Sequence, residues 1–288
     1  MTTSFDPRII RVGVEVSGVL RIYENLALTA NITKSWNALQ NEATVNIIGL
    51  AKEVRDHLST ETSPYNANYS PKRLTIEAGR ASTGTFTLFS GDIVQTDNTQ
   101  PPDIVTTIKS KTLQFNKGVI ISRSFAETVK LSVIAKKVAE DLGLTLIFEA
   151  TDRNISNFSF TGASTKLIQK LSECGGINAY ADDNKLVVKD VARALANIVH
   201  VVSERSGMIG TPELTDLGVR VRYLLDPNSQ LGGTLSIDSS LNPALSGDYT
   251  IYNLWHVVAS RDVPFYTIAE CVRPGRLDLS TGLPVLAR

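Results

Sequence analysis

The chain has 288 residues, of which 42% are hydrophobic and 20% charged. This composition supplies enough apolar surface for a core, so a mainly disordered protein is excluded. Basic and acidic residues number 29 each, so no net charge draws the chain to nucleic acid or an anionic membrane. The sequence has no apolar run long enough to span a bilayer, and the pattern of its first residues predicts no cleaved secretion signal. We expect assembly in a reducing cytoplasm, with Cys174 and Cys271 as buried apolar residues.

Residues 1–110 predict antiparallel β structure. A turn is expected at Ser17–Gly18, and apolar residues alternate with polar ones, as in a half-buried strand, at Leu26, Leu28, Ala30 and Ile32. A short helix follows near Val54 and Leu58, which are spaced by four. The stretch GTFTLFSGDIV predicts a strand that ends in a turn at Ser90–Asp92. We expect a small barrel or sandwich.

Residues 111–192 predict an α+β domain. A helix within 124–142 has an apolar stripe of Leu131, Ile134, Val138 and Leu142. Ser124 and Glu127 fit a capping box, although a start near Thr128 or Lys130 is an alternative, and Gly143 is a natural stop. A second helix capped by Ser164 and a hairpin that turns at Asp182–Asn184 follow.

Residues 193–288 return to strand patterns, which are interrupted by proline-containing turns. The order is therefore β, then α+β, then β again. The predicted fold class is mainly β with an α+β insertion, in which two β-barrel or sandwich domains, 1–110 and 193–288, flank a small α+β domain, 111–192.

The sequence offers no arrangement that is typical of a reactive site. The three histidines are His57, His200 and His256, and they lack the spacing of metal ligands. Both cysteines stand alone, and no serine-hydrolase motif or phosphate-binding loop is present. We therefore predict no catalytic, cofactor-binding or metal-binding residue, no cofactor and no enzyme activity.

Several residues have structural interpretations that outweigh chemical ones. The pair Asp182–Asp183 belongs to a predicted turn, and Glu140–Asp141 lies in the solvated last turn of a helix. Lys136–Lys137 is balanced by Glu140 one turn later. Trp36 and Trp255 are expected in a core or a subunit interface.

Three stretches together resemble a known family, the baseplate hub proteins at the centre of phage tails, best known from contractile-tailed phages. The first is NEATVNIIGLAKEVRDHL with RLTIEAG and LFSGDIV, and the second runs from ETVKLSVIAKK to NAYADDNKLVV. The third, DYTIYNLWHVVASRDVPFYTIAECV, contains His256, Asp262 and the pair Tyr266–Thr267 in the family's order. Here Phe265–Tyr266 stands where the family often has a tryptophan. The match spans most of residues 8–273.

The resemblance implies a structural role. Such hubs are homotrimers in which each subunit supplies two tail-tube-like β domains. The ring adapts the sixfold tail tube to the threefold central spike and lines the DNA channel. The implied partners are the spike, the tube or tube-initiator protein, other baseplate proteins and the tape measure protein, with only transient DNA passage and no membrane anchor. The implied location is the virion tail baseplate, assembled in the host cytoplasm. A channel lining should not be strongly basic, because DNA would stick to it.

Three alternatives stay open. The segment TVKLSVIAKKVAEDLGL resembles the first half of a LysM-type unit, which favours a tail protein that binds or degrades peptidoglycan. An ordinary cytoplasmic enzyme with a dispersed active site predicts a deep polar pocket. A tail-derived secretion or killing device is the third. The sequence does not identify the host, the interface residues or whether a trimer forms without partners.

Overall fold

The computed structural model describes residues 6–273 except 38–39, 64, 67–71, 117, 126, 175, 192 and 197–198. The chain divides into two compact units. Unit 1 comprises residues 1–33, 42–115 and 255–266, and unit 2 comprises 34–41, 116–254 and 267–288. The predicted domain boundaries after residues 110 and 192 stay predictions, and both chain ends, 1–5 and 274–288, lie outside the described residues.

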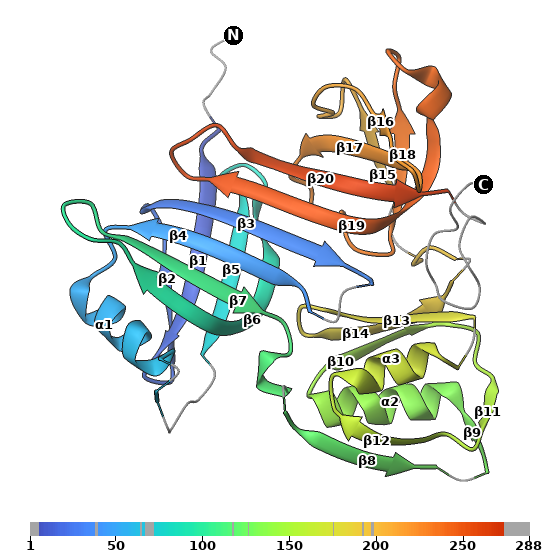
Figure 1. The fold of residues 1–288 in the computed structure, drawn as a ribbon. Coiled ribbons are helices and arrows are strands. Elements are labelled where there is room, and N and C mark those ends of the chain that lie inside the picture. The colour runs from blue at the N-terminus through green and yellow to red at the C-terminus, as the bar shows by residue number, and fades with distance from the viewer. Residues whose placement is uncertain are drawn as a thin grey trace. The chain divides into compact units, whose positions relative to one another are not determined.

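The fold is mainly β with an α+β portion in the middle of the chain, as the sequence predicted (Figure 1). Within the described residues, no helix is long and apolar enough to cross a membrane.

Unit 1 is built from antiparallel strands that pair in the order β3-β4-β7-β6-β5-β1-β2. The hairpin between β1 and β2 turns at Ser17–Gly18, as predicted, and both residues have positive φ, which suits a two-residue turn. In chain order the strands are β1 (Arg8–Val16), β2 (Val19–Tyr23), β3 (Ala27–Ser35), β4 (Glu42–Ile48), β5 (Arg73–Arg80), β6 (Gly84–Asn98) and β7 (Val105–Lys111).

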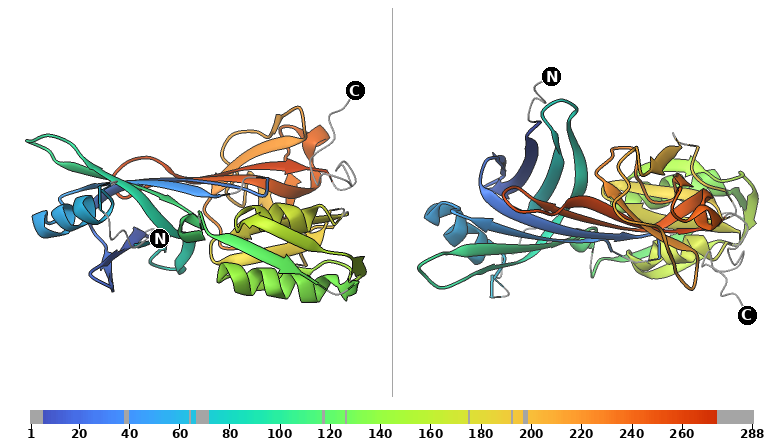
Figure 2. Two further views of the ribbon diagram at one scale, coloured as in Figure 1. Left: turned by 60° about the horizontal axis from the view of Figure 1, so that its bottom comes forward. Right: turned by 90° about the horizontal axis from the view of Figure 1, so that it is seen from above.

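The turn predicted at Ser90–Asp92 is wrong, because β6 continues through it for 15 residues. The first half of β6 pairs with β5 and the second half with β7, and each ladder contains a register shift. Such bulges bend a strand, and the sheet of unit 1 curves along β6 (Figure 2). The small residues that suggested a turn instead serve this bend, since a side chain at Gly91 would clash with the ring of Phe89.

The curved sheet encloses the core of unit 1, to which helix α1 (Lys52–Glu61) contributes Val54 and Leu58, the two residues predicted to face inward. Alternate residues of the strands fill the rest, because successive side chains point to opposite faces. Buried examples are Val12, Val14, Leu28, Ala30, Ile32, Val45, Ile47, Leu74, Ile76, Phe89 and Ile108.

The middle of the chain forms the α+β part of unit 2. The helices α2 (Leu131–Leu142) and α3 (Lys166–Ser172) lie side by side, with the sheet of β10, β14 and β13 on one side (Figures 1 and 2). The strands of this part are β8 (Ile120–Ser124), β9 (Thr128–Lys130), β10 (Thr145–Glu149), β11 (Asn154–Ser156), β12 (Ser159–Ala163), β13 (Ile177–Asp182) and β14 (Lys185–Asp190).

The ends of both helices differ in part from the prediction. The capping box at Ser124 and Glu127 is wrong: α2 begins at Leu131, as the later alternative start allowed, and Asp152 Oδ1 accepts the hydrogen bond of Ser132 N–H at its first turn. The reason is that residues 128–130 pair with β11. Gly143 does end α2 in a left-handed conformation. The Ser164 hydroxyl donates to the Asn116 carbonyl and does not cap α3.

The remaining strands of unit 2 pair in the order β15-β18-β19-β20-β17-β16. Their core is continuous with the β13–β14 hairpin, because Tyr180 and Val187 belong to the same cluster of buried residues as Val221, Leu235 and Ala269. The bounds are β15 (His200–Ser203), β16 (Glu213–Leu214), β17 (Val219–Leu224), β18 (Thr234–Asp238), β19 (Gly247–Ala259) and β20 (Phe265–Val272), and short 3-10 turns span Gln114–Asn116 and Pro243–Leu245.

Candidate functional site

The outward side of β3, β4, β7 and the second half of β6 forms a continuous polar surface in unit 1, here called the polar face. The registers place its side chains in three rows across the strands, because directly paired residues share a face. The rows are Thr29, Asn46, Thr107 and Asp97; then Asn31, Thr44, Lys109 and Gln95; then Thr33, Glu42, Lys111 and the buried Asp92.

Hydrogen bonds join neighbouring strands along the polar face. Asn46 donates to Thr29 Oγ1 at 3.4 Å and accepts from the Thr107 hydroxyl at 2.8 Å. Lys109 donates to Gln95, which in turn donates to Asp97, and Lys111 pairs with Glu42. Asp92, the partner of Lys111 in the β6–β7 ladder, adds a third carboxylate to those of Glu42 and Asp97, so the surface has no excess of positive charge. Asn46, Thr29, Thr107 and Gln95 use their polar groups within the face, and the nearby carboxylates balance both lysines, so the face is poorly suited to bind a polyanion.

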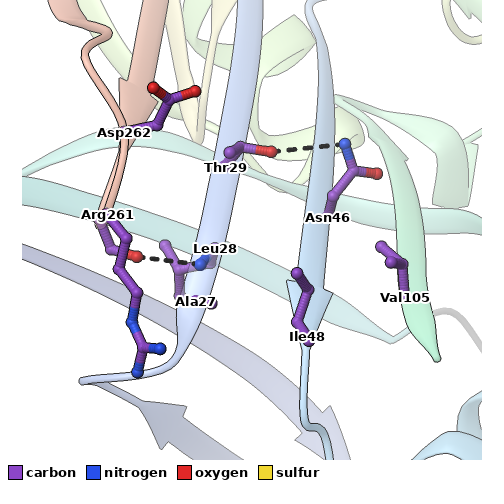
Figure 3. A pocket seen from close by; sticks show the side chains of 9 residues that line it. Ala27, Leu28, Thr29, Asn46, Ile48, Val105, Arg261 and Asp262 are labelled. Atoms are coloured by element: carbon purple, nitrogen blue, oxygen red, sulfur yellow. Dashed lines mark hydrogen bonds between the residues drawn. The ribbon is translucent and has the colours of Figure 1, made fainter. Parts of the chain in front are cut away.

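An apolar row ends the polar face where Ala27, Ile48 and Val105 pair. These three side chains and the loop that follows β19 line a pocket of about 200 Å³, shown in Figure 3. The Ser260 hydroxyl accepts from Leu28 N–H at 3.0 Å, which holds the loop against β3. Thr29 and Asn46 form the polar wall (Figure 3). The pocket is too small and too open for a substrate of drug size.

The loop between β19 and β20 contains part of the third stretch that resembles hub proteins. Arg8 Nη1 donates to the carbonyls of Asp262 at 2.8 Å and Val263 at 3.2 Å. The guanidinium groups of Arg8 and Arg80 lie 5.0 and 5.8 Å from the ring centre of Phe265. Cations over an aromatic face are attractive, so these contacts help to hold the loop in place.

The end strand β2 of unit 1 is unusually exposed. Of its five residues, four are exposed and only Tyr23 is partly buried. The exposed fractions reach 60% for Val19, 46% for Leu20 and 64% for Ile22. Apolar side chains on an edge strand invite pairing with another chain. The strand is therefore a candidate interaction surface.

A buried ion cluster in unit 2 escaped the sequence analysis. Lys34 Nζ lies 2.9 Å from Asp182 Oδ1 and 2.7 Å from Asp183 Oδ2, and only 5% of the lysine is exposed. Burial acts to lower the pKa of Lys34, but the two carboxylates outweigh it and raise the pKa. The two aspartates form the predicted turn and also bind the charged amine of Lys34. Continuing the alternation of Leu28 and Ile32 to position 34 would have indicated a buried lysine.

A second buried lysine, Lys189, lies on β14 of the β13–β14 hairpin. Lys189 Nζ donates to the Arg193 carbonyl at 2.8 Å and stands 4.7 Å from the ring centre of Trp36. Burial lowers its pKa to about 8, although Asp190 and Glu149 oppose the change. Trp36 also packs against Tyr180 and Tyr252, which confirms its predicted place in a core.

The histidines and cysteines considered as possible reactive residues lie at separate sites. His57 accepts from Ser17 N–H in unit 1, whereas His200 lies 3.5 Å from Asp226 in unit 2, where burial lowers its pKa and Asp226 opposes the change. His256 is buried. Cys271 is buried, as predicted, but the prediction is wrong for Cys174, which is only partly buried, and burial raises the pKa of both thiols. Among the described residues, no group of three His, Cys, Asp or Glu side chains is placed to hold a metal.

Glu140 and Asp141 form ion pairs, and Trp255 is partly buried. Asp141 forms a two-pronged ion pair with Arg123, and Glu140 pairs with Lys137, as the spacing predicted. Trp255 is half-buried on β19. The prediction that no residue is catalytic or binds a metal or cofactor stays a prediction.

The fold is similar to solved phage-tail structures. A tail protein from Neisseria meningitidis MC58 is 10% identical with a TM-score of 0.64, over 96% of this chain and 99% of that one. The 43 kDa tail protein of prophage MuSo2 from Shewanella oneidensis is 10% identical with a TM-score of 0.60, over 95% and 100%. An E. coli type VI secretion component, described as similar to T4 tail proteins gp27 and gp5, is 9% identical with a TM-score of 0.59, over 96% and 79%.

These identities establish the fold alone, and no curated protein matches the sequence significantly. The family model described as baseplate hub gp41 matches residues 9–271, which is nearly the whole chain. It spans the polar face, the ion cluster and the three stretches that resemble hub proteins. This chain therefore belongs to the baseplate hub gp41 family.

Proposed function

We propose that this baseplate hub forms a homotrimeric ring that connects the tail tube to the central spike and encloses the DNA channel. Each subunit supplies two β regions, so three copies present six of them to a sixfold tube and keep a threefold axis for the spike. The family supports the hub role in a phage tail. The similarity to a type VI secretion component described as similar to T4 tail proteins gp27 and gp5 supports partners within a tail-like assembly.

The observation that carries the proposal is the polar face of unit 1. A channel for DNA needs a wetted wall that does not bind phosphates, since each neutralised phosphate releases counterions and strengthens binding. The polar face has this character, because Asn46 bonds to two threonines and the two lysines lie among three carboxylates, those of Glu42, Asp92 and Asp97. We assign it to the wall of the channel.

Light scattering over a range of concentrations tests the ring. A trimer has three times the mass of 31.3 kDa, that is 93.9 kDa. The expected result is this mass at high concentration and ring-shaped particles by electron microscopy. A mass of 31.3 kDa at every concentration, with and without the spike protein, would overturn the proposal.

Added positive charge tests the wall. Asn31→Lys with Thr33→Lys places two exposed lysines on the polar face of each copy, and Thr83→Lys in the exposed turn after β5 is the control. Assembled rings with the first pair should bind duplex DNA roughly tenfold more tightly at low salt, with a steeper salt dependence than wild type. An equal gain in the control would show that the polar face is not the wall.

A further inference from the structure

We infer that the ring closes head to tail, with edge strand β2 of one copy pairing with edge strand β16 of the next. The contact rests on the proposed ring and assigns the residues that form it. Both strands end the pairing order of their own unit, and both carry an exposed apolar residue next to an exposed charge.

The first partner, β2, makes few stabilising contacts within its own chain. It pairs with β1 along one edge only, from Val12–Tyr23 to Val16–Val19. The register places Leu20 and Ile22 on one side of the strand and Val19 and Arg21 on the other, and all four are exposed. A strand that buries neither face is stabilised mainly by a neighbour, because cross-strand side-chain contacts are the main source of sheet stability.

The second partner, β16, has the complementary character. It pairs with β17 through Glu213–Arg220 and Leu214–Val219, and its other edge meets no described strand. Leu214 is 75% exposed. Glu213 and Asp216 are also exposed and form no salt bridge within the described part of the chain. The edge is therefore apolar at Leu214 and acidic at Glu213 and Asp216, and Arg220 beside Glu213 is already paired with Glu270.

Charge favours the contact between unlike edges over self-pairing. Arg21 is the middle residue of β2, so an antiparallel pair of two β2 strands centred on it sets Arg21 against Arg21. Like charges directly opposite each other destabilise a ladder. Two β16 edges would bring acidic residues together in the same way. Parallel pairing of β2 with β16 instead places Arg21 near Glu213 and Ile22 near Leu214.

The symmetry follows from the chemistry. Each copy has one basic apolar edge and one acidic apolar edge, so each copy binds two neighbours through different surfaces. Such a heterologous contact generates a ring when the rotation between copies closes. A self-complementary contact at β2 would give a two-fold pair, which does not fit a trimer.

Charge reversal tests the pairing in the full-length protein. Arg21→Glu and Glu213→Arg should each raise the concentration at which half the protein is trimeric by about tenfold. The double variant R21E/E213R should return this concentration to the wild-type value, because the opposite charges face each other again. Arg205→Glu, an exposed arginine in a turn of unit 2, is the control and should leave assembly unchanged. Additive losses in the double variant would overturn the inference.

Disulfide trapping supplies an independent readout in a Cys174→Ser background. Chains with Ile22→Cys mixed with chains with Leu214→Cys should form a covalent dimer on mild oxidation, whereas neither variant alone should. Cross-linking of Ile22→Cys with itself would demonstrate a two-fold contact and overturn the inference. An intact 93.9 kDa trimer without any cross-link would overturn this contact and leave the ring standing. A monomer in all conditions would overturn both proposals.

Discussion

The polar face of unit 1 and the Lys34 cluster of unit 2 contain the same kinds of groups in opposite environments. On the polar face, Lys111 and Glu42 keep 37% and 57% of their side chains exposed. In the cluster, the Lys34 side chain is 7% exposed and meets two carboxylates. Asn46 bridges two threonines on the polar face, whereas Asn41 in the cluster donates to the Ala181 carbonyl.

The difference shows how burial divides polar residues between stability and function. Exposed ion pairs contribute little to the free energy of unfolding, because water screens them and solvates either partner alone. A buried charge without its partner is costly, because nothing replaces the lost hydration. The cluster therefore constrains the fold, and the polar face is free to meet the requirements of a channel wall.

The largest expected effect is on the cluster. Lys34→Met leaves Asp182 and Asp183 without their cation and should lower the free energy of unfolding by about 3 to 4 kcal/mol. Lys111→Met on the polar face is the matched control and should change it by less than about 0.5 kcal/mol. Urea denaturation followed by circular dichroism measures both. Equal effects at the two sites would break the comparison.

Lys189 shows how burial of a lysine that forms no salt bridge with a described residue changes the pH dependence of the free energy of unfolding. Its pKa of about 8 in the folded state lies below the value of about 10.4 expected for an unfolded lysine. The unfolded state therefore binds more protons between these values, and the free energy of unfolding rises by roughly 2 to 3 kcal/mol from pH 8 to pH 10.4. Below pH 8 the contribution is constant, with the cost of burying the charged amine fully present.

The variant Lys189→Met should lose this rise, and the difference between its pH profile and that of the wild type isolates the lysine. Lys185→Met removes an exposed lysine from the same hairpin and should keep the wild-type profile. Denaturation curves at several pH values measure the slopes. A slope that persists in Lys189→Met would assign it to other groups.

The smallest effect is expected on the polar face itself. Asn46→Ala removes two cross-strand hydrogen bonds on a half-buried residue and should lower the free energy of unfolding by about 0.5 kcal/mol. Asn31→Ala, on an exposed residue of the same face, should have no measurable effect. Thermal unfolding of the two variants side by side resolves the difference. A loss as large as that of Lys34→Met would make the polar face a structural element.

Local pattern predicted much of the fold because each element encodes its own period. The four-residue spacing of Val54 and Leu58 predicted α1, Gly143 predicted the end of α2, and the Asp182–Asn184 turn predicted the β13–β14 hairpin. The predictions failed where a distant partner replaced a local signal. Pairing with β11 kept residues 128–130 out of α2, and Asp152, 20 residues beyond Ser132, caps that helix.

The candidate sites were less accessible to sequence reasoning. The alternation along β3 predicted which of its residues face outward, but the polar face exists only because β4 and β7 lie beside it in one register. Nothing local distinguishes Val19 and Ile22 of β2 from residues of a buried strand. Their exposure depends on the absence of any described segment that packs over either face of β2.

The sequence by itself determined the class of the protein: strands at both ends, an α+β segment between them, and patterns over residues 8–273 that resemble hub proteins. Local periodicity and turn residues suffice for that, because they act between neighbours in the chain. Only the tertiary structure decided that Lys34 meets Asp182 across 148 residues and that Asn46 joins Thr29 to Thr107. Burial and cross-strand partners are set by contacts between distant segments, and the position of one residue in the sequence does not specify them.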